Sequence, residues 1–202
     1  MFQMNKDYIG EDVESIEYIK KSGCYEVVIE KAEQLNGYNS KSEGIALNFS
    51  DSESRRGNLR MYYTNRDGLP VEFNQRHLSH LCYLLNQNAL LPGQDKQIAS
   101  LIGKIIGVVI EVNVRDYQVD NNGTKERRYA YDYILKSFYD SQTKQTSKEK
   151  LENRPAEIYN SCLQRYENAI EIELPKSEKL KDAEGFYQIN NADIPFYADI
   201  PF

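Results

Sequence analysis

The sequence of 202 residues has no tryptophan, two histidines and three cysteines, and no apolar run in it is long enough to span a membrane. An odd number of widely separated cysteines is not the pattern of a disulfide framework or of a metal-binding motif. The N-terminal segment has early acidic residues and lacks the apolar core of a signal peptide. We therefore expect a soluble protein of the reducing cytoplasm.

Motifs of the common enzyme classes are also missing. The chain contains no GxSxG, P-loop, HExxH or CxxC sequence. His77 and His80 lie one helical turn apart, but no acid or cysteine completes a metal site, so we interpret them as a solvent-facing pair. The acids Asp116, Asp120 and Asp132 flank a predicted hairpin, where solvated charge is expected. We therefore expect no catalytic function, no cofactor and no bound metal.

The net charge is -6, but the charge is unevenly distributed. Residues 1–50 carry 5 Lys+Arg against 9 Asp+Glu, residues 51–150 carry 15 against 12, and residues 151–202 carry 5 against 10. The mildly basic middle segment also holds many of the sixteen tyrosines. Aromatic rings interleaved with positive charge are typical of surfaces on which bases stack and phosphates pair. For any single tyrosine, the rim of a β-rich core is the alternative position.

Alternating apolar and polar residues predict three β-strands in the first third of the chain. They cover residues 22–34, 45–49 and 59–63 and form a meander. In the third strand, apolar residues occupy one face, and Arg60 and Tyr62 share the other face.

The pattern changes to a helical period after the third strand. Leucines at helical spacing predict one helix within residues 73–91, with Asn74 as its N-cap. Residues 103–118 and 125–140 predict two further strands joined by an Asn-Gly turn. Three strands, one helix and two strands are the element order of the OB-fold, a five-stranded, partly open barrel that holds oligonucleotides and oligosaccharides. We predict a mainly β protein with an OB-fold domain over residues 22–140, and a different sheet packed on a helix is the alternative.

Polar and charged segments flank this domain. Residues 1–21 are predicted to be an N-terminal extension, and residues 141–175 a linker with an accessory helix or strand. Apolar residues between positions 158 and 174 predict a helix that leads into a sixth strand. Residues 176–202 are predicted to form a disordered acidic tail.

The strand pattern identifies a candidate nucleic-acid surface. Arg60 and Tyr62 share the outer face of the third strand, and Arg115 and Tyr117 share that of the fourth. On the fifth strand, charge and aromatic rings again alternate, and the pattern leaves open which face is buried. Stacking on an exposed ring is worth about 1 to 3 kcal/mol per base and tolerates any sequence. The predicted nucleic-acid-binding residues are Arg60, Tyr62, Arg115, Tyr117, Lys125, Arg127, Tyr129 and Tyr131.

The end of the chain repeats one motif. The sequence ADIPF occurs at residues 192–196 and again at residues 198–202, where it ends on the terminal carboxylate. Proline is disfavoured in core strands, so we interpret the repeat as a peptide presented to a partner. A pocket with an apolar base and a basic rim would accept the terminal ring and carboxylate. The predicted partner-binding residues are Asp193, Ile194, Pro195, Phe196, Asp199, Ile200, Pro201 and Phe202.

The terminal ADIPF resembles the acidic tip of bacterial single-stranded DNA-binding proteins, where an Asp-rich run ends in Ile-Pro-Phe. The resemblance implies that the tip recruits replication, recombination and repair enzymes and can lie against the DNA-binding groove. This chain departs from that family in having one Asp per copy of the motif. Within residues 20–140 the chain contains the segments GCYEVVIEKAEQ, HLSHLCYLL and LIGKIIGVVIEV. Their coarse pattern resembles a phage or prophage family of small proteins, encoded beside recombination genes, that are regarded as single-strand binders.

Two functional hypotheses follow. The first is sequence-independent binding and protection of single-stranded DNA during phage or host replication and recombination, with recruitment of a partner enzyme through the tail. The alternative is a protein-interaction adaptor that docks in the host's tip-binding pocket without binding DNA. Neither needs a membrane, and both are compatible with a homo-oligomer. Only the first requires that the arginines and tyrosines of the strands be exposed and clustered.

Overall fold

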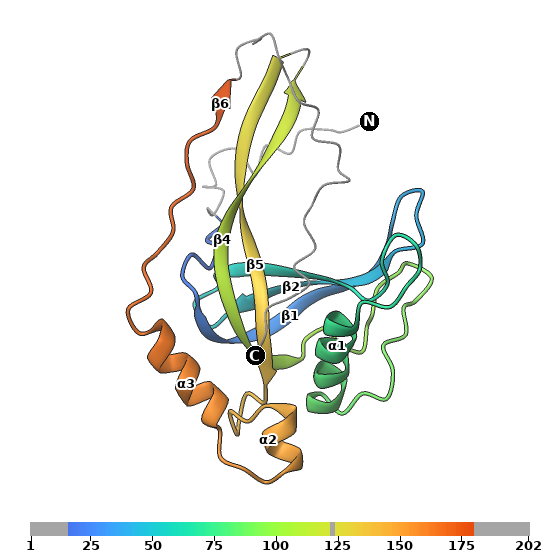
Figure 1. Cartoon of the computed structure of the whole chain (residues 1–202), viewed down its shortest axis with the longest axis vertical. Coiled ribbons are helices and arrows are strands. Elements are labelled where there is room, and N and C mark those ends of the chain that lie inside the picture. The colour runs from blue at the N-terminus through green and yellow to red at the C-terminus, as the bar shows by residue number, and fades with distance from the viewer. Residues whose placement is uncertain (1–15, 122–123, 180–202) are drawn as a thin grey trace, which may run out of the picture. The chain divides into compact units, whose positions relative to one another are not determined.

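The computed structural model describes residues 16–121 and 124–179. Six strands form one mainly antiparallel arrangement in the order β3-β2-β1-β4-β5-β6, and three short helices accompany them (Figure 1). The elements are β1 (Gly23–Asn36), β2 (Glu43–Asp51), β3 (Arg56–Tyr62), α1 (Glu72–Leu84), β4 (Ile105–Asn121), β5 (Thr124–Tyr139), α2 (Ser147–Leu151), α3 (Glu157–Tyr166) and β6 (Glu178–Lys179).

The chain divides into two compact units. The first contains residues 1–115 and 131–174, and the second contains residues 116–130 and 175–202. In its described part, the second unit consists of the far ends of β4 and β5 and of the two-residue strand β6, whose Lys179 pairs with Glu126 of β5.

The predicted alternation of β2 and β3 is confirmed, and it places one face of both strands in the core of the first unit. Ile45, Leu47 and Phe49 of β2 and Leu59 and Met61 of β3 are each less than 5% exposed. Burying an aliphatic or aromatic side chain of this size contributes about 1.5 to 3 kcal/mol, so these strands supply much of the stability.

Strand β1 changes its phase part-way along. Val27 and Ile29 are buried, and a bulge between Ile29 and Lys31 then shifts the register against β2. The shift brings Ala32 into the core and turns Lys31 to the outside. The outer face of β1 therefore carries different residues than an unbroken alternation would predict.

The mainly β class is confirmed, but the sheet and the helices differ from the predicted barrel. Strands β3 and β5 are not paired within the described ranges, so the sheet is not closed. Helix α1 lies between β3 and β4 as predicted, but two helices, α2 and α3, follow β5, where one accessory helix or strand was predicted. Helix α1 also ends at Leu84, well before the end of the predicted range 73–91. No described helix is both long enough and apolar enough to cross a membrane.

Helix α1 buries its leucine face, but two predictions about its polar residues are wrong. Leu78, Leu81 and Leu84 lie in the core. Asn74 is not the N-cap, because the helix begins after Val71 and the Asn74 amide instead donates a hydrogen bond to the Tyr62 carbonyl at 2.8 Å. His77 is 6% exposed and faces the core, whereas His80 is exposed, so the two histidines are not a solvent-facing pair.

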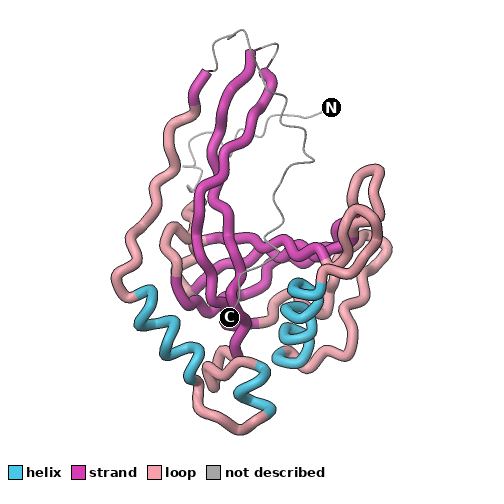
Figure 2. The backbone as a smooth tube through the Cα atoms, in the orientation of Figure 1, coloured by secondary structure: helices cyan, strands magenta, loops and turns pink. Residues whose placement is uncertain are grey.

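The connection from α1 to β4 contains no helix or strand, but it is anchored to the sheet (Figure 2). Main-chain hydrogen bonds of 2.9 Å join the Gln34 N–H to the Lys96 carbonyl and the Ile98 N–H to the Ala32 carbonyl. Ile98 and Leu101 are almost fully buried. The loop therefore contributes to the hydrophobic core of the first unit.

The polar run after β5, predicted as a loop or linker, contains a capped helix. The side chain of Thr146 and that of Glu149 form a reciprocal capping box at the start of α2. Glu149 is 1% exposed, and its second oxygen accepts a hydrogen bond of 2.8 Å from the Ile158 N–H at the start of α3. These hydrogen bonds outweigh burial and lower the pKa of Glu149. Helix α3 was predicted, and the strand after it is limited to Glu178 and Lys179.

The segment before β1 and the segment after α3 meet beside β3 and β5. Tyr18 forms a parallel bridge with Arg56 of β3, and the Tyr133 hydroxyl of β5 donates a hydrogen bond of 2.9 Å to the Ile19 carbonyl. The Ile172 N–H donates to the Lys20 carbonyl at 2.9 Å. The core thus includes Ile19, shortly before β1, and Ile172 after α3 packs against it.

Candidate nucleic-acid interface

Strands β1, β2 and β3 present an exposed face on the side opposite the core. Their alternation and register place outward-facing residues in four cross-strand rows. Most of these side chains on β3 and β1 are exposed to solvent, while small residues predominate on β2. We call this surface the outer face. From β3 through β2 to β1, its rows are Arg56, Ser50 and Val28; Asn58, Asn48 and Lys31; Arg60, Ala46 and Glu33; and Tyr62, Gly44 and Leu35.

Gly44 allows the ring of Tyr62 to lie close to the sheet. The two residues are directly opposite each other on β2 and β3. A Cβ atom at position 44 would lie 2.7 Å from the Met61 carbonyl oxygen and 3.1 Å from Cδ1 of Tyr62, which is too close for any larger residue without movement. Tyr62 remains 37% exposed, so part of its ring faces solvent. The arrangement resembles a stacking platform.

Arg60 is the free cation of the outer face. It makes no hydrogen bond or ion pair with any residue in the described ranges. By contrast, Arg56 pairs with Glu30 at 3.7 Å, and Lys31 pairs with Glu33 at 2.6 Å. Positive charge on this face is therefore concentrated beside Tyr62, two residues along the same strand.

Arg115 is exposed and unpaired among the described residues, but it does not lie beside Arg60. Its position on β4 is five residues beyond Ile110, which pairs with Gly23 at the start of β1. Arg60 is aligned, through β2, with Glu33 near the other end of β1. The two arginines therefore belong to opposite ends of the sheet, and the predicted cluster is not formed by them.

Tyr131 lies on the inward side of β5, which settles the face that the sequence left open. Tyr133 and Leu135, on the same side, are 8% and 6% exposed, whereas Ile134 on the other side is 39% exposed. The Tyr131 hydroxyl donates a hydrogen bond of 3.0 Å to the Ile172 carbonyl, and its pKa is raised by burial. This tyrosine is used for packing within the first unit.

The remaining predicted strand residues belong to the second unit. Tyr117 is 44% exposed and Lys125 is exposed, while Tyr129 is half-buried. Arg127 lies 3.5 Å from Asp116, so its charge is partly balanced. The second unit thus has a small aromatic and basic group of its own. The predicted tail residues at positions 193–196 and 199–202 lie outside the described residues.

Two asparagines were missed by the sequence interpretation. Asn48 and Asn58 are directly opposite each other in the middle of the outer face, and both are exposed. Their amides make no hydrogen bond with a described residue. The alternation of β2 and β3 was sufficient to place both on this face, but only cations and aromatic rings were considered in the prediction.

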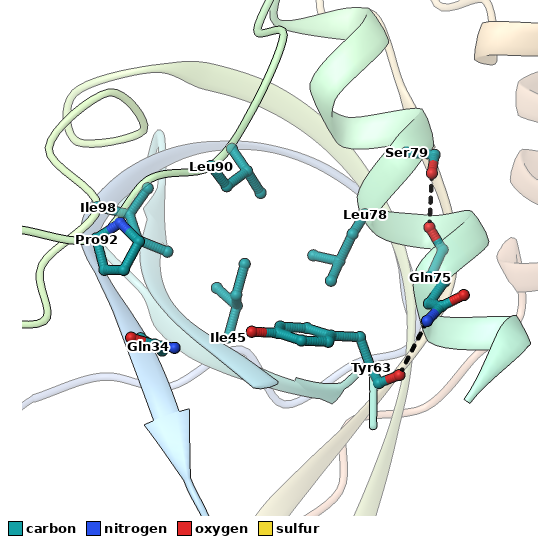
Figure 3. A pocket seen from close by; sticks show the side chains of 9 residues that line it. All are labelled: Gln34, Ile45, Tyr63, Gln75, Leu78, Ser79, Leu90, Pro92 and Ile98. Carbon is teal, nitrogen blue, oxygen red and sulfur yellow. Dashed lines mark hydrogen bonds between the residues drawn. The ribbon is translucent and has the colours of Figure 1, made fainter. Parts of the chain in front are cut away.

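A recess of about 380 Å³ lies on the inner side of the same strands, between their ends, α1 and the loop before β4 (Figure 3). Leu78, Leu90 and Ile98 give it an apolar interior, and Gln75 is held at the rim by a hydrogen bond of 3.2 Å to the Tyr63 carbonyl. The recess and the outer face use alternate residues of the same strands. Its lining consists of Gln34, Ile45, Tyr63, Gln75, Leu78, Ser79, Leu90, Pro92 and Ile98.

In the described part of the chain, no group of three or more His, Cys, Asp or Glu side chains is arranged to hold a metal ion. The sequence matches no protein-family model, and no curated protein shows significant similarity to it. The geometry of the outer face is therefore the basis for a functional assignment.

Proposed function

We propose that this protein binds single-stranded DNA on the outer face, without dependence on base sequence. The observation that carries the proposal is the exposed ring of Tyr62 over Gly44, next to the unpaired Arg60. Residues two apart on a strand are about 7 Å apart, so one side chain can stack on a base while the other pairs with a nearby phosphate. Such binding requires no catalytic group, and we infer a non-enzymatic role in the cytoplasm.

The strand order supports an OB-like interpretation of the first unit. The order β3-β2-β1-β4-β5 is that of an OB barrel opened between β3 and β5, and OB barrels bind ligands on the outer face of strands 2 and 3. The gap between β3 and β5 is occupied by Ile19, which receives the hydrogen bond from Tyr133. The surface that OB barrels use for binding therefore corresponds to the outer face of this protein.

We assign the repeated ADIPF to the recruitment of a replication or recombination enzyme. Its support is the sequence alone: a duplicated apolar motif that ends on Phe202 and resembles the tip of bacterial single-stranded DNA-binding proteins. The two copies lie six residues apart, and we assign to the copy at residues 192–196 the role of raising the local concentration of the motif. In this proposal, the first unit holds DNA and the tail holds the partner.

The direct test is a fluorescence-anisotropy titration of a labelled oligothymidine with wild-type protein, Tyr62→Ala and Arg60→Ala. Loss of one stacked base costs about 1 to 3 kcal/mol, so we expect Tyr62→Ala to weaken binding about fivefold to 150-fold. Tyr83→Ala is the matched control, because Tyr83 lies on α1 and is 40% exposed against 37% for Tyr62. Equal affinities of Tyr62→Ala and the wild-type protein would show that the outer face is not the binding site.

An adaptor that does not bind DNA is the second candidate, and the charges of the outer face favour it. Two of its three cations, Arg56 and Lys31, already pair with acids, and the whole chain is acidic. Titrations of full-length protein and of protein ending at Asn191 at low salt separate the two functions. Binding by the shortened form supports the DNA proposal, and absence of binding by both forms supports the adaptor.

A further inference from the structure

Helix α3 lies along the outward side of β4, and one side-chain contact near each end fixes its position. Near its start, the ring of Tyr159 lies 5.0 Å from that of Tyr139, which in turn packs against Gly107 in the space that a Cβ atom would fill. Near its end, the Tyr166 hydroxyl donates a hydrogen bond of 3.0 Å to Glu111. The helix is thus aligned with the strand over these positions.

Cys162 must face the sheet between these two contacts. Residues 159, 162 and 166 are spaced by three and four positions, which places them in one row on the helix surface. Because Tyr159 and Tyr166 both touch the sheet, Cys162 points in the same direction.

Cys24 occupies the matching position on the sheet. Gly107, Val109 and Glu111 alternate along β4 and therefore share its outward side. Cys24 of β1 is paired with Val109, the middle one of the three. The middle residue of the helix row therefore lies over the middle position of the strand row, and the two thiols meet.

The electrostatics of the two thiols agree with this placement. Burial raises the pKa of Cys24 to about 12, and the neighbouring Cys162 thiol contributes to the rise. Burial also raises the pKa of Cys162, but the Arg165 guanidinium offsets part of that rise. Both cysteines are only half-buried, so small reagents can reach them.

We propose that Cys24 and Cys162 form an oxidation site, at which a low-molecular-weight disulfide such as glutathione disulfide converts the two thiols into one disulfide between β1 and α3. The Cys162 thiolate attacks one sulfur of the oxidant and releases the first thiolate. The Cys24 thiolate then attacks Sγ of Cys162 and releases the second. Two thiol protons are lost, and the two electrons reduce the oxidant to two thiols.

The bond would restrain the unfolded chain over the long loop between residues 24 and 162. Closing a loop of this length stabilises a folded protein, and for a domain of this size we expect a rise in melting temperature of about 5 °C or more. The inference does not depend on DNA binding, because neither thiol belongs to the outer face.

The test uses full-length reduced protein incubated with excess glutathione disulfide at about pH 8.5, where more thiolate is present. After acid quenching, we expect peptide mapping under non-reducing conditions to show a Cys24–Cys162 link and a decrease from three free thiols to one. Cys82→Ser is the control and should form the same link, whereas Cys162→Ser should form none. A product with only glutathione adducts, or with a bond that includes Cys82, would overturn the proposal.

Discussion

His77 gives a specific prediction about stability, because it is a buried ionisable group with no hydrogen-bond partner in the described part of the chain. Its ring packs edge-on against Phe73, with centroids 4.4 Å apart, and also lies near Phe138. Neither ring nitrogen has a hydrogen-bond partner among the residues that the structure describes. Burial, with a smaller contribution from the nearby His80, lowers the pKa of His77 to about 4.

The sign of the effect follows from linkage. The unfolded chain binds a proton at His77 near pH 6.5, whereas the folded chain does so only near pH 4. Stability from the neutral ring is therefore complete above pH 6.5 and is lost as the pH falls through this window. A difference of about 2.5 pKa units at 1.36 kcal/mol each corresponds to a loss of about 3 kcal/mol by pH 4.

The perturbation is His77→Leu, which keeps the side chain apolar and of similar size. We expect it to be more stable than wild type at pH 7 by about 1 kcal/mol or more, because two unpartnered nitrogens disappear. The advantage should grow by about 3 kcal/mol on going to pH 4. Urea denaturation followed by far-ultraviolet circular dichroism measures both values, with His80→Gln as the exposed control. A constant difference between His77→Leu and wild type over this range would refute the reasoning.

Further predictions concern the outer face, the tail and the capping box. Gly44→Val should weaken oligothymidine binding severalfold in anisotropy titrations by displacing Tyr62, and unchanged affinity would contradict the platform. If Arg56, Arg60 and Lys31 all contact phosphates, the plot of log affinity against log salt should have a slope of about -2, and a flat plot would exclude them. Removing residues 192–202 should raise DNA affinity, since an anionic segment competes with DNA for the cations, and unchanged binding would exclude this autoinhibition. Glu149→Ala should lower the unfolding free energy by about 2 kcal/mol or more in urea, and a smaller loss would contradict its role as a helix joint.

The elements that could be predicted from the sequence are those with a simple periodicity and one buried face. Ile45, Leu47 and Phe49 repeat every second residue, so both the strand and its buried face could be predicted from the sequence. The short helix at Ser147 was missed because its neighbours are polar, although the Thr-x-x-Glu spacing from Thr146 to Glu149 is a known start signal. The capping-box spacing alone was therefore sufficient to predict this helix.

The candidate site was harder to predict from the sequence than these elements. It depends on the strand order and on side chains that suit both a core rim and an exposed surface. No local pattern reveals that Arg60 and Arg115 stand at opposite ends of the sheet, since this follows from the pairing of β1 with both β2 and β4. Tyr131 carries a polar tip on an apolar ring and fits a core rim or a surface equally well. The bulge after Ile29 also reverses the phase of β1, which alternation alone would not reveal.

The hydrogen bond between Ile172 and Lys20 brings together two points of the chain that are far apart in sequence. Lys20 and Ile172, near the two ends of the described part of the first unit, are therefore neighbours in space. A fold that is entered and left at one place can be inserted into a surface loop of another protein without pulling its host apart, and its ends can be joined to make new termini elsewhere. The contact between Lys20 and Ile172 therefore predicts that the first unit tolerates insertion into a host loop or circular permutation at this point.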